Sequence, residues 1–367
     1  MIRTILLAAA LPFIGTATIA ATKTLEVRNR CGPVRNCFAT ISGALDRANA
    51  DTGQDWITIR VGPGTYREKP TITRSHVQIV GSGAGRTRLH FNAVAQTAKA
   101  YHRDGWGTPG SATLTIDATD VVVRGLTVEN DYNYLANDRL TDGDPAKIGN
   151  PQAVALLLDI HSDKVSIRDA AIIGFQDTLF ANGKRAHISR SLIAGNVDFI
   201  FGNGQVLIEK SEIRSRTRSS PTPGDGFQSF IAAPSTPLGQ SMGIVFYRSR
   251  LTREGGVPNG SVALARPWHP TKRFPDGRYA DPRAVGQVSF IDCFMDAHIG
   301  ADHWATMNGT ARDGSMTSVF RPQDSRFFEA GSYGPGALHR DIGMPRAVVA
   351  DIGAVKSLLF TGWHERP

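Results

Sequence analysis

Short apolar stretches rich in valine and isoleucine recur along this chain at intervals of about twenty residues. Ile167, Ile188 and Ile208 lie in three of them, 21 and 20 residues apart. Phe246 follows 38 residues after Ile208 and Phe290 follows 44 residues later, so these intervals are near two periods. Short strands at such a period, with no helix between them, are typical of a parallel β-helix whose coils stack on one another. A β-sandwich is the alternative, but its hairpin turns, about 8–12 residues apart, are not the dominant pattern here.

The predicted fold is therefore all-β, a single-stranded parallel β-helix with a short capping helix at its N-terminal end. Thr40 is placed to cap that helix. Ile41, Ala44, Leu45 and Ala48 follow at the i, i+3, i+4, i+7 spacing of one apolar helix face. Such a helix would cover the open end of the coil stack, where unpaired strand edges invite aggregation.

Four polar segments rich in glycine and proline interrupt the strand pattern and are predicted to be long projecting loops. They are residues 95–112, 131–150, 217–228 and 267–282. Function is usually found beside such loops. The last segment, residues 347–367, is mildly helical and is expected to pack on the outside. Residues 22–367 are predicted to form one β-helix domain.

The N-terminus has the pattern of a secretory signal peptide. Arg3 precedes the apolar residues 5–14, and small residues follow as far as Ala20 and Ala21. We predict that residues 1–20 are a signal peptide cleaved near Ala20 or Ala21. The apolar part is too short to span a bilayer, so no stable membrane anchor is expected, and the protein is predicted to be secreted to the periplasm or the medium.

The chain is basic, with 41 lysines and arginines against 33 acidic residues and a formal net charge of +8. Nucleic acid, an anionic polysaccharide and a membrane surface are all partners of the matching sign. The basic residues are dispersed, and the only local cluster is Arg214, Arg216 and Arg218, for which a solvated strand face is the simpler interpretation.

Three cysteines occur in the chain. Cys31 and Cys37 bracket a short loop that an oxidising compartment would close as a disulfide, whereas Cys293 lies in an apolar stretch and is expected to be a buried free thiol. The sequence has no CxxC or HExxH motif, so no metal site is predicted.

Two aspartates occupy matching places in two similar segments, GFQDTLF at residues 174–180 and GNVDFIF at residues 195–201. Asp177 and Asp198 are 21 residues apart, one predicted coil, so their side chains should stack on strands about 4.8 Å apart. Two adjacent carboxyl groups cannot easily both ionise, which separates an acid from a base or nucleophile. A retaining glycosidase and an ester hydrolase both use such a pair, and an aspartate ladder without catalytic function is the third interpretation.

Further polar residues favour a catalytic site over a ladder. Gln176 precedes Asp177, and Gln152 lies 24 residues before Gln176, about one coil earlier. Two glutamine amides can donate hydrogen bonds to a developing oxyanion. Arg266 can pair with a carboxylate, and Trp268 can stack on a sugar face.

These segments resemble the signature blocks of the pectin methylesterase family, in the family's order and with similar spacing. The blocks are QAVAL at 152–156, GFQDTLF at 174–180, DFIFG at 198–202 and LARPW at 264–268. GTYRE at 64–68 and RFFE at 326–329 match flanking blocks, and WHP at 268–270 and GRYADP at 277–282 resemble the bacterial branch. The similarity covers nearly all of the chain after the signal peptide.

The resemblance implies a right-handed β-helix enzyme that hydrolyses the C6 methyl esters of polygalacturonate, releasing methanol, without a metal or organic cofactor. In that family's scheme Asp198 is the nucleophile and Asp177 is the acid that protonates methanol and then the base that activates water. Gln176 supplies the oxyanion donor with support from Gln152, and Arg266 orients Asp198.

The resemblance also implies substrate contacts for Trp268 and Thr113, with Phe201 and Phe230 as candidates for the groove wall. The expected partner is methyl-esterified polygalacturonate and not nucleic acid, and the protein is expected to be a monomer. A β-helix polysaccharide hydrolase or lyase, and a non-catalytic pectin-binding protein, are the alternatives.

The chain departs from the family pattern at a few positions. Ala265 replaces the usual glycine beside Arg266, and Ser191 and Ser211 stand where relatives often have a pair of cysteines. The serines are expected to change stability and not chemistry.

Overall fold

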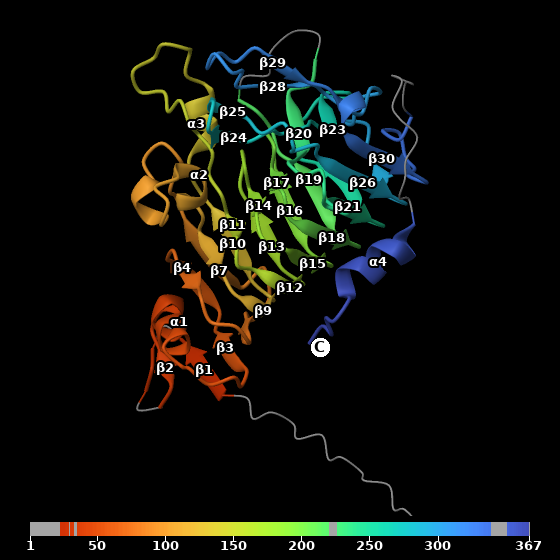
Figure 1. Cartoon of the computed structure of the whole chain (residues 1–367). Coiled ribbons are helices and arrows are strands. Elements are labelled where there is room, and N and C mark those ends of the chain that lie inside the picture. The colour runs from red at the N-terminus through yellow and green to blue at the C-terminus, as the bar shows by residue number, and fades with distance from the viewer. Residues whose placement is uncertain (1–22, 29, 33–34, 220–225, 339–350, 367) are drawn as a thin grey trace, which may run out of the picture.

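The structure is a computed structural model that describes residues 23–28, 30–32, 35–219, 226–338 and 351–366. The predicted signal peptide, residues 1–20, lies outside these residues. Figure 1 shows an elongated stack of short strands that runs from the N-terminal elements to the C-terminal ones. The predicted parallel β-helix is confirmed, since the long sheets pair in parallel throughout.

Three long sheets run the length of the stack, and their strands are given in sheet order. The first sheet contains β2 (Cys37–Phe38), β1 (Lys23–Val27), β3 (Ile57–Val61), β6 (Val77–Val80), β9 (Thr119–Arg124), β12 (Asp163–Arg168), β15 (Arg185–Ser189), β18 (Gln205–Glu209), β21 (Ile244–Tyr247), β26 (Gln287–Ile291) and β30 (Arg326–Ala330). The second contains β27 (Phe294–Met295), β22 (Arg250–Arg253), β19 (Glu212–Ser215), β16 (Leu192–Gly195), β13 (Ala171–Ile173), β10 (Thr127–Asn130), β7 (Thr87–Phe91) and β4 (Gly64–Arg67). The third contains β23 (Val262–Ala265), β20 (Ser229–Pro234), β17 (Ile200–Gly202), β14 (Leu179–Ala181), β11 (Leu156–Leu158), β8 (Leu114–Ile116) and β5 (Thr71–Ile72).

The residues that revealed the period stack directly on one another inside the helix. Ile167 pairs with Ile188, Ile188 with Ile208, Ile208 with Phe246, and Phe246 with Phe290. All five side chains are at most 1% exposed, and the two phenylalanine rings stack with centroids 4.4 Å apart. A one-residue slip would turn these side chains outward, so their burial sets the register of the coils.

The capping helix α1 (Ile41–Asn49) covers the N-terminal end of the core, as predicted. The Thr40 side chain accepts a hydrogen bond from the backbone N–H of Gly43, and Ile41, Ala44, Leu45 and Ala48 are all buried. The Glu68 carboxylate accepts hydrogen bonds from the backbone N–H groups of Ile41 and Ser42. These groups lie in the first turn of the helix, where backbone N–H groups have no partner within the helix.

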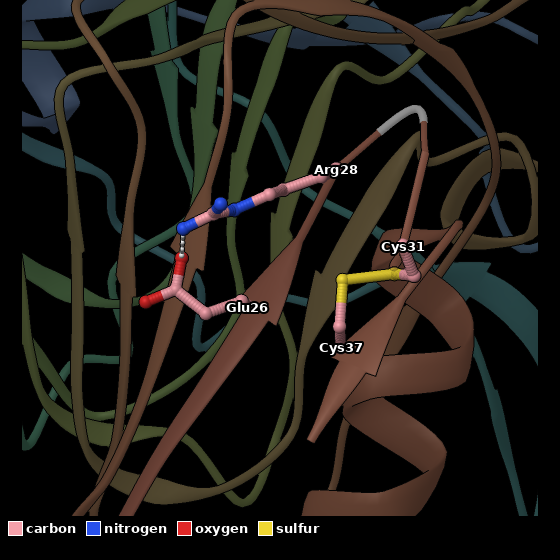
Figure 2. Close-up of a disulfide and its surroundings, with 4 residues drawn as sticks. All are labelled: Glu26, Arg28, Cys31 and Cys37. Carbon is pink, nitrogen blue, oxygen red and sulfur yellow. Dashed lines mark hydrogen bonds and ion pairs between the residues drawn. A yellow bond between two sulfur atoms is a disulfide. The ribbon is translucent and has the colours of Figure 1, made fainter. Parts of the chain in front are cut away.

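The two cysteine predictions are also confirmed. Cys31 and Cys37 form a disulfide beside β1 and β2, close to the ion pair between Glu26 and Arg28 (Figure 2). Cys293 is a buried free thiol. At the two serine positions, the N–H of Ser191 donates to Oγ of Ser211 at 3.2 Å, and a hydroxyl ladder therefore joins coils there.

At the C-terminal end, α4 (Ile352–Phe360) packs against the outside of the first sheet, where Val355 and Leu359 contact a cluster that includes Val245. No helix among the described residues is long and apolar enough to cross a membrane.

The remaining elements lie outside the three long sheets, several of them along one side of the stack (Figure 1), and those between residues 99 and 280 fall in predicted loops, whereas those after residue 306 do not. These elements are η1 (Lys99–Tyr101), α2 (Gly107–Gly110), α3 (Tyr134–Asp138), the hairpin of β24 (Thr271–Phe274) and β25 (Gly277–Ala280), the hairpin of β28 (Met307–Gly309) and β29 (Ser318–Phe320), and η2 (Pro322–Asp324). Loop 217–228 is described only in part. The α2 segment and the hairpin β24–β25 form walls above the outer face of the third sheet.

Candidate active site

Asp177 and Asp198 lie on neighbouring coils, each two residues before a strand of the third sheet. Leu179 at the start of β14 pairs with Ile200 at the start of β17, and the N–H of Asp177 donates to the carbonyl of Val197 at 3.0 Å. Both aspartates adopt left-handed backbone conformations, with φ of 63° and 48°. Aspartate tolerates this region better than most residues, but each such residue stores strain that the surrounding structure must hold. The two carboxyl groups are therefore held in place by the coil turns.

Arg266, which directly follows β23, binds Asp198 through two charge-assisted hydrogen bonds. Its Nε donates to one carboxylate oxygen at 2.7 Å and its Nη2 to the other at 2.6 Å. The Arg266 side chain is 20% exposed and that of Asp198 is 10% exposed, so the pair is largely shielded from solvent. Burial lowers the pKa of Arg266, but the charge and the hydrogen bonds of Asp198, together with the charge of Asp177, outweigh it, and the net pKa is raised. Asp198 is thus held as an oriented carboxylate.

Asp177 has a different environment. Burial, followed by the negative charge of Asp198, raises the pKa of Asp177 well above its usual value, while Arg266 opposes the shift. Among the described residues, no donor is hydrogen-bonded to its carboxyl group. Asp177 is therefore the member of the pair that retains a proton, and Asp198 is the member that is paired with a cation.

Gln176 and Gln152 both line the cleft in which the aspartates lie. They belong to adjacent coils, because the N–H of Ala153 donates to the carbonyl of Gln176 at 3.1 Å. The Oε1 atom of Gln152 is buried without a hydrogen-bond partner among the described residues. An unpaired buried amide oxygen is a group that a bound water or ligand can satisfy.

The cleft has a volume of about 740 Å³ and an aromatic floor. Phe180 and Phe201 stack with centroids 4.2 Å apart on the outer face of the third sheet. Trp268 meets Phe201 edge-on at 5.5 Å, and Trp106 meets Phe180 in the same way at 5.5 Å. A flat apolar floor beside two carboxyl groups suits the face of a sugar ring.

Two of the predicted substrate contacts lie outside the lining of this cleft. Thr113 is fully buried, its hydroxyl donates to the carbonyl of Glu129 at 2.9 Å, and it does not line the cleft. Phe230 lies under the guanidinium of Arg266, 3.8 Å from the ring centroid to Cζ, and is likewise absent from the cleft lining. Phe230 therefore supports Arg266, and Thr113 supports the sheet beneath the site. The departure at Ala265 is accommodated, because this residue is buried in the regular strand β23.

Several cleft residues were not predicted from the sequence. Trp106 and Thr108 come from the α2 segment, and Lys272 and Arg278 come from the hairpin β24–β25. The sequence signal for Trp106 was a tryptophan in a predicted projecting loop, and the structure shows that this side chain is exposed. Lys272 forms an ion pair with Asp281 at 2.8 Å, so its role in orienting the hairpin was not visible in the sequence.

Comparisons with known proteins agree with this geometry. A family model described as Pectinesterase matches residues 33–311. Pectinesterase A of Dickeya dadantii (strain 3937) is 40% identical over 344 residues, which are 92% of this chain and 92% of that protein.

The solved structures that resemble this chain are also pectin methylesterases. A crystal structure of pectin methylesterase in complex with a hexasaccharide has a TM-score of 0.84 and 37% identity, covering 95% of this chain and 100% of that one. The pectin methylesterase from Yersinia enterocolitica has a TM-score of 0.77 and 40% identity, covering 87% of this chain and 96% of that one.

Proposed function

The chain belongs to the pectinesterase family and is a carboxylic ester hydrolase that demethylesterifies pectin, and from this premise we propose that it acts through an acyl-enzyme on Asp198. The substrate is methyl-esterified polygalacturonate, and the products are methanol and a free carboxylate on the polymer. The observation that carries the proposal is the unequal pair: Asp198 held as a carboxylate by Arg266, beside a buried Asp177 that keeps its proton.

In the first step, a carboxylate oxygen of Asp198 attacks the ester carbonyl carbon, and the carbonyl oxygen becomes an oxyanion. The side-chain amides of Gln176 and Gln152 line the cleft where that charge develops and are the donors for it. Asp177 transfers its proton to the methoxy oxygen as the bond from carbon to that oxygen breaks. Methanol leaves, and an anhydride joins Asp198 to the uronate.

In the second step, Asp177 is a carboxylate and acts as the base. It takes a proton from a water molecule, which attacks the uronate carbonyl carbon of the anhydride. The bond to Asp198 breaks, the product leaves as a carboxylic acid that releases its proton to the solvent, and both aspartates return to their starting protonation states. The released Asp198 carboxylate pairs with Arg266 again. The same guanidinium therefore orients Asp198 as the nucleophile in the first step and stabilises it as the leaving group in the second.

Substrate contacts follow from the cleft. Trp268 and Phe201 form the apolar floor on which galacturonate rings lie, and Trp106 extends it. The net charge of +8 favours a polyanionic chain over a neutral one, and no nucleic acid partner is proposed.

The remaining parts of the proposal concern location and assembly. Residues 1–20 are a signal peptide, residues 22–367 form a single catalytic domain, and the mature protein is a monomer without a membrane anchor in the periplasm or the medium. The disulfide between Cys31 and Cys37 supports an oxidising compartment. Intact mass of the protein recovered from periplasm and medium tests this, because a retained N-terminus contradicts cleavage.

The function is tested by methanol release from pectins of graded methylation, with Asp198→Ala as the control. We expect methanol and new carboxylates in equal amounts, rising with methylation, and no activity in the variant. New reducing ends without methanol would identify a glycosidase, unsaturated products a lyase, and binding without turnover a non-catalytic protein.

A further inference from the structure

Four side chains form a single column behind the turn that carries Gln176 and Asp177, and we call them the arginine–aromatic column. Its members are Arg216, Phe175, Tyr134 and Arg218. The Arg216 guanidinium lies 3.8 Å from the Phe175 ring centroid. The Phe175 and Tyr134 rings stack with centroids 5.3 Å apart and an angle of 10°. Arg218 lies over the Tyr134 ring at 5.9 Å, so a cation stands at each end of an aromatic pair.

Both cations are anchored by carboxylates. Nε of Arg216 donates to Glu254 at 2.9 Å, and Arg218 forms two hydrogen bonds with Asp138, at 3.0 and 2.7 Å. Asp138 ends α3, which also contains Tyr134, so the column joins the loop of residues 131–150 to the segment after β19. Arg216 and Arg218 are therefore largely shielded and do not form a solvated face. Arg214, the third member of the basic cluster, binds only Glu212 in the described structure and lies outside the column.

The column meets the catalytic turn through Phe175, the residue directly before Gln176. Nη1 of Arg216 donates to the carbonyl of Gly174 at 2.9 Å, and the N–H of Asn196 donates to the carbonyl of Phe175 at 3.0 Å. The turn is therefore held by its side chain and by its backbone. The next residue but one, Asp177, has a φ of 63°. A strained residue keeps such a conformation only where the surrounding structure imposes it.

Tyr134 is 3% exposed, and burial raises its pKa to about 12, so the phenol stays protonated and serves as a packing partner. Cation–π contacts are stronger when they are shielded from water, and two of them together are comparable with the strain of one residue in the left-handed region. Loss of the column should therefore let the turn relax.

We propose that Arg216 and Tyr134 are positioning residues that hold Gln176 and Asp177 in reacting geometry by clamping Phe175 between them. The inference rests on the proposed function, since it assigns to these residues the alignment of the oxyanion donor and the acid. A displacement of about 1 Å in such groups can lower a rate about 100-fold, whereas the apolar floor that binds the sugar rings is unaffected.

The test compares Arg216→Met with Arg214→Met, a matched control on the same segment. We expect kcat for methanol release to fall about 10- to 100-fold in R216M, with KM within about twofold of the parent. R214M should keep both constants within about twofold. Tyr134→Ala should behave as R216M does, and Tyr134→Phe, which preserves the ring stack, should behave as the parent.

Thermal unfolding followed by circular dichroism shows whether each variant is folded. If R216M does not fold, Tyr134→Ala decides, because that residue lies on a loop outside the coils. The inference is overturned if the folded variant keeps kcat within about twofold of R214M, or if the loss appears in KM alone. Absence of methanol release from the parent and R214M would instead contradict the proposed function, so the two failures are distinguishable.

Discussion

Replacing Asp177 with asparagine should abolish activity and, at the same time, stabilise the fold in a pH-dependent way. In the folded protein the pKa of Asp177 lies well above its usual value, because of burial first and the Asp198 charge second. In the unfolded chain an aspartate titrates at about pH 4. Between these two values the unfolded chain has released a proton that the folded protein still holds. The free energy of unfolding therefore falls as pH rises through that window, by about 1.4 kcal/mol per pH unit, and stays lower above it.

Asparagine has nearly the same shape and no proton to lose, so D177N should escape this loss. The two proteins should be equally stable below about pH 4, and the difference in favour of D177N should grow by about 1.4 kcal/mol per pH unit above it until the raised pKa is passed. Every other titrating group is shared and cancels in the comparison.

The assay is equilibrium unfolding in guanidinium chloride at a series of pH values, with Asp198→Asn as a control of opposite sign. That change leaves the Arg266 guanidinium with one acceptor oxygen and no charged partner, and it should destabilise the fold by roughly 3 kcal/mol. This is the low end for a broken buried pair, because a fifth of the arginine side chain is exposed. The reasoning is refuted if D177N and the parent have parallel pH profiles, or if D177N is the less stable at neutral pH.

Three further predictions concern other parts of the molecule. Trp268→Ala should raise KM for methylated pectin about fivefold, for about 1 kcal/mol of lost ring contact, with kcat little changed in steady-state assays; an unchanged KM would remove Trp268 from the binding floor. Cys31→Ser with Cys37→Ser should lower the free energy of unfolding by about 2 kcal/mol, as expected for a loop with a sequence separation of 6, and leave kcat unaltered; equal stability of both proteins in denaturant titrations would contradict it. Dialysis against a chelator should leave methanol release unchanged, because the proposed steps use aspartates and amides alone; recovery of a lost rate by added metal would show otherwise.

The architecture could be predicted from the sequence because burial imposes the coil period on it. Ile167, Ile188 and Ile208 must point inward on successive coils, and that requirement appears directly as a spacing of about twenty residues. The capping helix was predictable for the same reason, because its buried residues recur in the sequence at the spacing of one helix face. Stacking of Asp177 on Asp198 followed from the repeat, and the ion pair to Arg266 agrees with the suggested role.

Two predicted contacts lie outside the cleft lining, because the period does not determine side-chain direction. Thr113 lies directly before β8, and its hydroxyl turns inward to a backbone carbonyl. Phe230 was placed on the groove wall, but it lies beneath a guanidinium that arrives from another coil. The column also escaped prediction, because Arg218 and Asp138 are 80 residues apart and meet only through a loop that folds back on the coils.

The central claim is that Asp177 and Asp198 act as one unit on a methyl ester, and a double-mutant cycle measures this most directly. Methanol release is followed for the parent, Asp177→Ala, Asp198→Ala and the double variant on the same methylated pectin. We predict that each single change lowers kcat at least about 1,000-fold and that the double change costs no more than the larger single one, as for groups that serve one reaction step. The assignment of the two aspartates would be contradicted if the loss of kcat in the double variant equalled the product of the two single losses. It would also be contradicted if either single variant kept kcat within about tenfold of the parent.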